Sequence, residues 1–594
     1  MKPQVDKLVT FPFVCVVLLG LAIGHLSTTQ VQAATGVARP NVILVMTDDQ
    51  GYGDVGANGN TMIRTPHLDR LHGQSVRLTD FHVDPTCSPT RSALMTGRYS
   101  SRTGVWHTIM GRSLMRRDEV TLGDVFAQNG YATAMFGKWH LGDNYPLRPQ
   151  DRGFQEVLCH GGGGISQTPD FWGNDYFDDR YWHNGKPQQY TGYCTDVFFD
   201  GALQFIQKNK DQPFFAYIAT NTPHGPLNVA EKYSKPYEEK GVPSSMAKFY
   251  GMIENIDENM GRLLAKLDAW GLDENTIVIF MTDNGTASGV IGGGTPKKGP
   301  SPSDDGWRGF NDGMRGQKGS EYDGGHRVPC FFRWPAGGIE GGRDVEQLSA
   351  HVDILPTLSD LCGLKRDEQV KVDGSSLAPL LRAEATSWPE RTLFVHSQRI
   401  EHPEQWRKSA VMTERWRLVN GAELYDIQAD HGQAENLAAA QPEVVARLRE
   451  AYDGWWEGLS ERFDEYVEIV IGSDEENPAR ITCHDWHGEN VPWNQGAIRS
   501  APAANGFWAI DVQRDGTYEF TLREQPTEAD FPIQANEARL EIGDVDVSGP
   551  IEPGATGVTF TVDLRAGKTR METWLTDAKS GKSRGAFFVY VRRR

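Results

Sequence analysis

Four short apolar runs, each followed by polar residues, constrain the fold of this chain most strongly. Short runs that are apolar throughout are typical of strands buried on both faces, as in a parallel sheet covered by helices. Segments with helical periodicity lie between them, for example residues 122–128 and 246–270, so the order of elements predicts an α/β fold. Ligands of such sheets bind beyond the carboxyl ends of the strands. The runs and the polar residues after them are 41–46 with Asp48 and Asp49, 132–136 with Lys138 and His140, 214–219 with His224, and 276–281 with Asp283 and Asn284.

The second half of the chain has a different pattern. Residues 389–463 contain short strand-like segments and an amphipathic helix over 442–462, which predicts a small antiparallel subdomain with one helix. Residues 464–594 contain evenly spaced strand-like segments separated by turns, which predicts a β-sandwich-like domain. A chain of 594 residues also needs more than one core. We therefore expect a main domain over 38–388, followed by these two regions.

The first 33 residues have the pattern of an export signal. Lys2 and Lys7 precede a short apolar stretch over 11–23, and Ala33 closes a small-residue cleavage pattern. The stretch is too short for a comfortable membrane span, with a non-cleaved anchor as the alternative. We expect cleavage of residues 1–33, no stable membrane span, and a periplasmic or secreted protein.

The net charge of −19 limits the partners of the chain. It argues against non-specific binding to nucleic acid or to anionic membranes, so an anionic substrate would need a locally basic cavity. Six cysteines follow the export signal, and an exported chain can form disulfides. Cys159 could pair with Cys194, and Cys330 with Cys362, although the sequence does not settle connectivity.

Acidic and amide residues at two strand ends predict a metal site. Asp48 and Asp49 follow one apolar run, and Asp283 and Asn284 follow another, so all four are expected at one edge of the sheet. Oxygen ligands suit a hard cation, Ca²⁺ or Mg²⁺, rather than zinc. A single Asp after a strand more often starts a turn or caps a helix, but two pairs at one edge favour a metal.

Basic residues in similar positions predict a site for a tetrahedral anion. Lys138 and His140 share a Lys-Trp-His element, and His224 lies in a loop stiffened by two prolines. Lys318 lies in an Arg-Gly-Gln-Lys-Gly loop, and Arg91 lies one helical turn after a cysteine. A lone basic residue in a loop is usually solvated, but the common placement of these residues favours a basic cavity.

Residues 87–98, Cys-Ser-Pro-Thr-Arg-Ser-Ala-Leu-Met-Thr-Gly-Arg, form the most specific motif. This motif resembles the signature of formylglycine-dependent sulfatases of the alkaline phosphatase superfamily, and the resemblance covers about residues 38–460. It implies an alkaline-phosphatase-like mixed sheet sandwiched by helices, a small antiparallel C-terminal subdomain and, here, an extra β-rich C-terminal domain. Four further motifs occur in the family order: Asp48-Asp-Gln-Gly-Tyr-Gly-Asp54, Gly137-Lys-Trp-His140, Thr282-Asp-Asn-Gly285 and Gly324-Gly-His-Arg-Val-Pro329.

The resemblance implies a modified nucleophile and a bound metal. Cys87 would be oxidised by a formylglycine-generating maturation enzyme to formylglycine (3-oxoalanine), whose hydrate attacks the substrate. One Ca²⁺ would be held by Asp48, Asp49, Asp283, Asn284 and the modified residue 87.

The resemblance also assigns roles to the basic residues. Arg91 would steady the hydrate, and Lys138 and Lys318 would bind sulfate oxygens. His140 would position the hydrate and later collapse the hemiacetal. His224 would protonate the leaving alcohol or stabilise its charge.

The implied activity is hydrolysis of O-sulfate esters with release of inorganic sulfate. We expect a sulfated carbohydrate as substrate, with a small aryl sulfate as a surrogate. Two alternatives remain: a phosphodiesterase or phosphonate monoester hydrolase that uses the same aldehyde, and a non-catalytic sulfated-glycan binder with an unmodified cysteine. The expected substrate contacts are His160, Trp172, Trp307 and His326, with core packing as the alternative for the tryptophans. The glycines at 161–164 predict a flexible turn, because a phosphate loop would need a following Lys-Ser/Thr.

Overall fold

A computed structural model describes residues 39–289, 309–367 and 369–594. The expected export signal and Trp307 lie outside these described residues. Among the helices within them, none has both the length and the apolar character that crossing a membrane requires.

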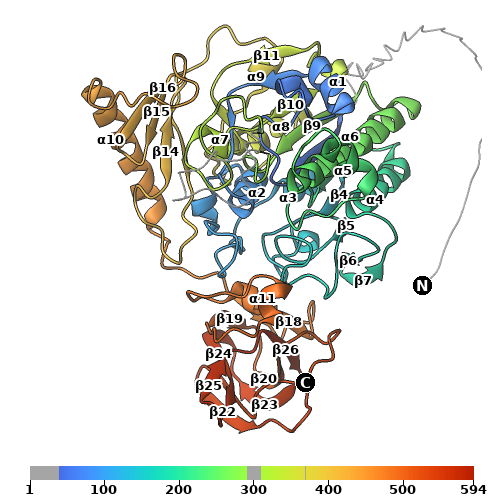
Figure 1. The fold of residues 1–594 in the computed structure, drawn as a ribbon, viewed down its shortest axis with the longest axis vertical. Helices are drawn as coiled ribbons and strands as arrows, with labels where there is room; N and C mark the ends of the chain where they lie inside the picture. Colours follow the sequence, from blue (N-terminus) through green and yellow to red (C-terminus); the bar gives the residue numbers. More distant parts are fainter. Residues whose placement is uncertain (1–38, 290–308, 368) are drawn as a thin grey trace, which may run out of the picture. The chain divides into compact units, whose positions relative to one another are not determined.

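A ten-stranded mixed sheet forms the centre of the main domain (Figure 1), in the order β11-β2-β10-β9-β1-β8-β4-β5-β6-β7. The five strands β9, β1, β8, β4 and β5 are parallel, as the apolar runs predict, and β10 pairs antiparallel with β9. The strands are β1 (Asn41–Thr47), β2 (Val76–Leu78), β4 (Ala132–Gly137), β5 (Glu156–Cys159), β6 (Arg180–His183), β7 (Lys186–Gln189), β8 (Phe214–Ala219), β9 (Thr276–Thr282), β10 (Cys330–Arg333) and β11 (Arg343–Val345), and a separate pair is β3 (Phe81–His82) with β12 (Ser349–Ala350).

Both faces of the sheet are covered, which explains why its central strands are apolar throughout. On β1, Val42 and Leu44 belong to one hydrophobic core, and Ile43 and Val45 belong to a second core. The first core includes side chains of α2, α3 and α8, and the second includes side chains of α1, α4 and α6. The expected α/β fold is therefore confirmed. The helices of this part of the chain are α1 (Pro66–Gln74), α2 (Cys87–Thr96), α3 (Leu122–Gln128), α4 (Cys194–Asn209), α5 (Glu231–Glu238), α6 (Ser244–Ala269), α7 (Asp323–His326), α8 (Ile354–Cys362) and α9 (Ala378–Leu381).

A four-stranded antiparallel sheet follows, with one long helix against it. Leu418 of the sheet shares a hydrophobic core with Tyr452 and Trp455 of the helix. The apolar face predicted for the helix over 442–462 is therefore buried against the sheet. These elements are β13 (Leu393–His396), β14 (Ser409–Met412), β15 (Trp416–Val419), β16 (Glu423–Asp426) and α10 (Pro442–Ser460).

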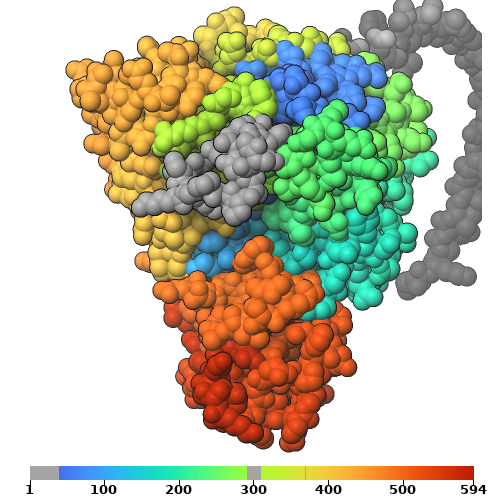
Figure 2. Space-filling view, viewed as in Figure 1, coloured from blue at the N-terminus to red at the C-terminus, as the bar shows by residue number. Residues whose placement is uncertain are grey.

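The remaining strands form two sheets that share one hydrophobic core, which we name the C-terminal sandwich (orange to red in Figures 1 and 2). The sequence pattern missed its longest strand, β24, because that strand carries charged and threonine side chains and is only half buried. The first sheet contains β17 (Ile469–Ile471), β19 (Trp508–Val512), β24 (Gly567–Asp577), β21 (Glu537–Ile542), β22 (Val545–Pro550) and β25 (Lys582–Arg584). The second contains β18 (Ala479–Thr482), β26 (Phe588–Arg593), β20 (Gly516–Arg523) and β23 (Val558–Leu564), and α11 (Gln495–Arg499) precedes β19.

The cysteines do not crosslink these parts. All six cysteines of the described residues are free and buried, so neither candidate pair forms a disulfide in this structure. Hydrophobic packing and buried ion pairs hold the parts together instead.

One such ion pair joins the four-stranded sheet to the main domain. Arg417 of β15 is fully buried, and its guanidinium donates to Asp80 at 2.8 Å and to Asp323 at 3.2 Å. Burial raises the pKa of Asp80, but Arg417 and His82 outweigh that effect and hold the pKa below its usual range. Both carboxylates therefore depend on one cation.

We predict that Arg417→Met lowers the free energy of unfolding by about 3 kcal/mol, because two buried carboxylates lose their counter-charge. Urea denaturation of the purified protein measures the change. Arg415→Met is the matched control: Arg415 also pairs with a carboxylate, Asp426, but its side chain is 56% exposed. The control should cost less than about 1 kcal/mol. Equal losses in the two variants would contradict the role of Arg417.

Candidate active site

The candidate nucleophile lies at the first residue of a helix that is wholly buried. Helix α2 begins at Cys87, and all ten of its residues are buried. The helix ends at Gly97, whose φ of 66° is the left-handed conformation that glycine adopts without strain. The amino end of a helix carries partial positive charge, so an anionic oxygen on residue 87 would be favoured there.

Oxygen ligands from two strand ends meet this cysteine. One ligand atom from each of Asp48, Cys87 and Asp283 lies within 4.8 Å of the others, and all three residues are buried. The Asp49 amide donates to Asp283 Oδ1 at 3.1 Å, and Asn284 Nδ2 donates to Asp49 Oδ1 at 2.9 Å. The structure thus brings together all the metal-binding residues that the sequence predicted.

The residues of this cluster fit a divalent cation. Asp48 Oδ1 and Asn284 Oδ1 are buried and have no hydrogen-bond partner among the described residues. Burial raises the pKa of Asp48 well above its usual value, and the neighbouring charge of Asp283 adds to this effect. A hard cation would use the unpaired oxygens and relieve the repulsion. The donor set therefore supports a Ca²⁺-type site.

Three basic side chains surround the acidic cluster. Arg91 donates to Asp283 Oδ2 at 2.7 and 3.1 Å, Lys138 Nζ lies 2.7 Å from Asp48 Oδ2, and Lys318 Nζ lies 2.5 Å from Asp49 Oδ1. Three cations thus balance three carboxylates. A bound divalent cation would make the site net positive, which suits a sulfate ester despite the acidic protein around it.

His140 is arranged as a neutral imidazole with one free lone pair. Its Nε2 lies 2.8 Å from the Thr108 carbonyl oxygen, which only accepts hydrogen bonds, so Nε2 carries the hydrogen. Its Nδ1 is buried without a partner among the described residues. Burial and the nearby Lys138 hold the pKa of His140 well below its usual value. The ring is therefore prepared to accept a proton.

Gly163 makes room for this ring. A Cβ atom on Gly163 would lie 2.1 Å from the His140 ring, so a larger residue would displace it. The predicted turn at 161–164 is present, but all four glycines are buried, and Gly163 packs against a candidate catalytic group.

His224 lies beside Asp49 and lines the same cavity as Cys87. Its Nδ1 lies 2.6 Å from the Gly225 carbonyl oxygen, which leaves Nε2 toward Asp49 Oδ2 at 3.9 Å. Burial and Lys318 lower the pKa of His224 to about 3, although Asp49 opposes this shift. An added negative charge on a bound ester would favour its protonated form.

A cavity of about 250 Å³ opens over these groups. Five of its lining residues were missed from the sequence. Arg399 lies between β13 and β14, and Trp493 lies between β18 and β19. Both residues are therefore far from Cys87 in the sequence. No local motif marks either of them. The lining residues are Cys87, Thr108, Ile109, His140, Gln167, His224, Lys318, Arg399 and Trp493.

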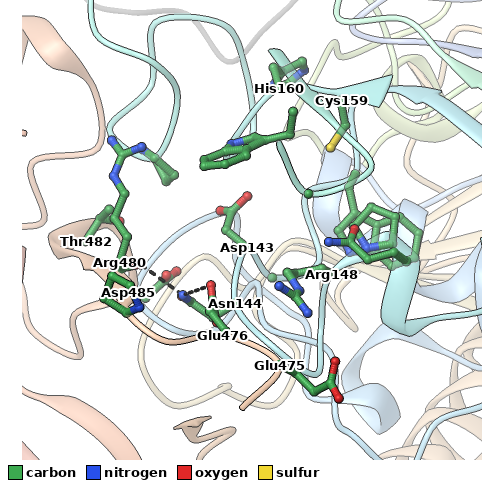
Figure 3. Close-up of a pocket in the computed structure, with 18 of the residues that line it drawn as sticks. Asp143, Asn144, Arg148, Cys159, His160, Glu475, Glu476, Arg480, Thr482 and Asp485 are labelled. Carbon is green, nitrogen blue, oxygen red and sulfur yellow. Dashed lines mark hydrogen bonds between the residues drawn. The ribbon is translucent and has the colours of Figure 1, made fainter. Parts of the chain in front are cut away.

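The predicted substrate contacts that the structure describes do not line the cavity over Cys87. His160 lies in a separate cavity (Figure 3). The acidic residues that line this cavity outnumber its arginines, so the lining is unfavourable for a negatively charged sulfated ligand. His326 is fully buried, and its Nδ1 lies 2.8 Å from His82 Nδ1. Trp172 is not part of the cavity over Cys87; it packs against the core of the C-terminal sandwich. Trp307 lies outside the described residues.

Comparisons with known proteins agree with this geometry. The family model described as "Sulfatase" matches residues 40–364, and that described as "N-sulphoglucosamine sulphohydrolase, C-terminal" matches residues 317–453. The chain is 30% identical to human arylsulfatase A over 517 residues, which cover 76% of this chain and 94% of the relative. It is also 30% identical to mouse N-acetylgalactosamine-6-sulfatase, over 60% of this chain and 69% of the relative.

The comparison with solved structures agrees with the family models. The crystal structure of Ps i-CgsB in complex with k-i-k-neocarrahexaose matches with a TM-score of 0.63 and 26% identity, over 72% of this chain and 95% of that chain. The family match covers more than half of the sequence, and the acidic cluster, the basic residues and Cys87 lie together within it. The chain belongs to the sulfatase family.

Proposed function

We propose that this protein is an exported, Ca²⁺-dependent sulfatase that hydrolyses O-sulfate esters of a sulfated carbohydrate, with formylglycine at position 87 as nucleophile. The main support is the cluster of Asp48, Cys87 and Asp283, with ligand atoms within 4.8 Å of one another. A thiol has no evident use between buried carboxylates, whereas an aldehyde hydrate supplies oxygens that suit both a hard cation and attack on sulfur. The proposal requires a maturation enzyme that oxidises the cysteine.

Ca²⁺ would be held by the oxygens of Asp48, Asp49, Asp283 and Asn284 together with residue 87. When bound, it would lower the pKa of the hydrate hydroxyl and draw electron density from the sulfate group. Lys138 and Lys318 would then bind the equatorial sulfate oxygens, whose charge grows in the transition state.

The first step forms one bond and breaks one. A hydrate oxygen of residue 87 gives its proton to solvent water and bonds to sulfur, while the bond from sulfur to the substrate's alcohol oxygen breaks. His224, which lines the cavity over Cys87, would give the departing oxygen its proton. Arg91, held by Asp283 and by the Lys138 carbonyl at 3.0 Å, would keep helix α2 and the hydrate in register.

The second step restores the aldehyde. His140 Nδ1, the free lone pair of a neutral ring, would accept the proton of the remaining hydroxyl. The carbonyl reforms, the bond from carbon to the sulfate oxygen breaks, and inorganic sulfate leaves. Water then hydrates the aldehyde for the next turnover. A serine at position 87 lacks the second hydroxyl, so it would stop at the sulfated stage.

The substrate class is argued from the relatives. Mouse N-acetylgalactosamine-6-sulfatase and the structure with k-i-k-neocarrahexaose indicate sugar sulfates among the relatives. A small aryl sulfate should serve as a surrogate, because the reacting groups contact only the sulfate and the leaving oxygen. A phosphonate monoester hydrolase or phosphodiesterase would instead turn over phosphonate or phosphate esters faster than sulfate esters, and a non-catalytic glycan binder would turn over none.

We predict that residue 87 is an aldehyde in protein produced with its maturation enzyme, as measured by mass spectrometry of the tryptic peptide. Cys87→Ala should lower sulfate release by more than about 1,000-fold while the melting temperature is unchanged, because the nucleophile is lost. Cys87→Ser should accumulate a sulfated peptide.

An intact, alkylatable thiol at residue 87 in protein that releases no sulfate would contradict the proposal. So would wild-type turnover by Cys87→Ala. Assaying sulfate, phosphate and phosphonate esters of the same nitrophenol in one experiment separates a sulfatase from the alternative hydrolases.

We also predict that Lys318→Met lowers kcat/KM for nitrophenyl sulfate about 100-fold, because a fixed cation is removed from the developing negative charge. Lys408→Met is the matched control. Lys408 is exposed and reaches only the Gly319 carbonyl, next to Lys318, so the same charge is removed nearby. The control should stay within about twofold of wild type. Similar losses in both variants would show that only general electrostatics is involved.

A further inference from the structure

The cavity over Cys87 has a neighbour on the side of His224. The second cavity measures about 390 Å³, and the two share Gln167, His224 and Trp493 in their linings. In the proposed reaction His224 protonates the leaving oxygen. The part of the substrate attached to that oxygen would therefore extend toward the second cavity.

Trp493 lies at the junction and is fixed by its backbone. Its carbonyl accepts from the Thr168 amide at 3.1 Å, and the preceding Pro492 carbonyl accepts from Thr168 Oγ1 at 2.7 Å. Asn494 and Gln167 form a β-bridge, and the Gln495 amide donates to the Ser166 carbonyl. Residues 492–495 are thus paired with the 166–168 loop of the main domain.

The side chain of Trp493 is nevertheless exposed. It is 44% exposed, and Phe531 is the other exposed large hydrophobic side chain among the described residues. Exposure of an indole ring to water costs free energy. The backbone hydrogen bonds nevertheless hold the Trp493 ring at the cavity over Cys87. Such a placement is typical of a ring that packs against a ligand.

The rest of the second cavity suits an anionic sugar. Ile165 and Pro226 provide apolar surface. Arg499 also lines it, and its guanidinium lies over the Trp172 ring at 4.5 Å, so the predicted substrate residue Trp172 acts by holding an arginine. Arg399, on the first cavity, adds another cation. Guanidinium groups pair well with sulfate and carboxylate oxygens.

We propose that Trp493 and Arg499 of the C-terminal sandwich bind the sugar unit that follows the reacting sulfate ester, on an oligosaccharide with a further sulfate or carboxylate. The indole packs on a sugar ring, and the guanidinium binds the second anionic group. The C-terminal sandwich is then a specificity-determining part of the active site. This inference rests on the proposed sulfatase function.

The experiment compares two substrates. Wild type is first assayed on nitrophenyl sulfate and on oligosaccharides derived from carrageenan, chondroitin sulfate and heparin, and the best oligosaccharide is retained. The ratio of kcat/KM for that oligosaccharide to kcat/KM for nitrophenyl sulfate is then measured for each variant. This ratio cancels differences in active fraction and in formylglycine content.

Trp493→Ala should lower the ratio at least about tenfold, since a stacking surface is lost. Arg499→Gln should lower it about fivefold or more, and the loss should shrink at high salt, because screening weakens the same contact in wild type. Phe531→Ala is the matched control: it removes the other exposed aromatic of the sandwich, which lines neither cavity, and should leave the ratio within about twofold.

A ratio that is unchanged in Trp493→Ala would overturn the inference while leaving the sulfatase function intact. Wild-type activity on nitrophenyl sulfate but on none of the oligosaccharides would also overturn it. Absence of sulfate release from every substrate by protein that carries the aldehyde would instead overturn the proposed function.

Discussion

The repulsion among buried carboxylates at one edge of the sheet is the constraint on which the rest of the site depends. Asp48, Asp49 and Asp283 are all buried, and burial of unpaired charge is costly. Arg91, Lys138 and Lys318 offset that charge one for one. The cluster is then balanced in formal charge, and it becomes net positive when a divalent cation binds. An acidic protein can therefore contain a cavity that attracts a sulfate ester.

The parallel sheet itself brings the acidic and basic residues of the site together. Parallel strands β1, β4, β8 and β9 end at the same edge, so the residues that follow them converge. Helix α2 brings Cys87 to that edge and is held inside the protein along its whole length. Cys87 and the residues that directly follow β1, β4 and β9 are thus positioned by regular elements. His224, Lys318 and the residues that would choose the substrate come from loops and from the C-terminal sandwich.

The sequence predicts well the residues that follow the central strands, and it predicts poorly the residues that would contact the rest of the substrate. Asp48, Lys138 and Asp283 follow apolar runs, so their convergence follows from the parallel sheet alone. Trp493 carries no such signal, because it reaches the cavity only through the pairing of residues 492–495 with the 166–168 loop. His326 is buried at the end of α7 and pairs with His82, and no sequence pattern indicates this because it depends on tertiary packing. Strand β24 lies inside its sheet, between β19 and β21, and was missed because a half-exposed strand has a weak apolar pattern.

The central claim is that the carboxylates around residue 87 form a site for one divalent cation. The most direct measurement is calorimetric titration of Ca²⁺ into chelator-treated protein, with the melting temperature followed in parallel. We predict one bound Ca²⁺ per chain and a rise in melting temperature, with both effects lost in Asp283→Asn. No binding by the wild-type protein, and a melting temperature that Ca²⁺ does not change, would contradict the account.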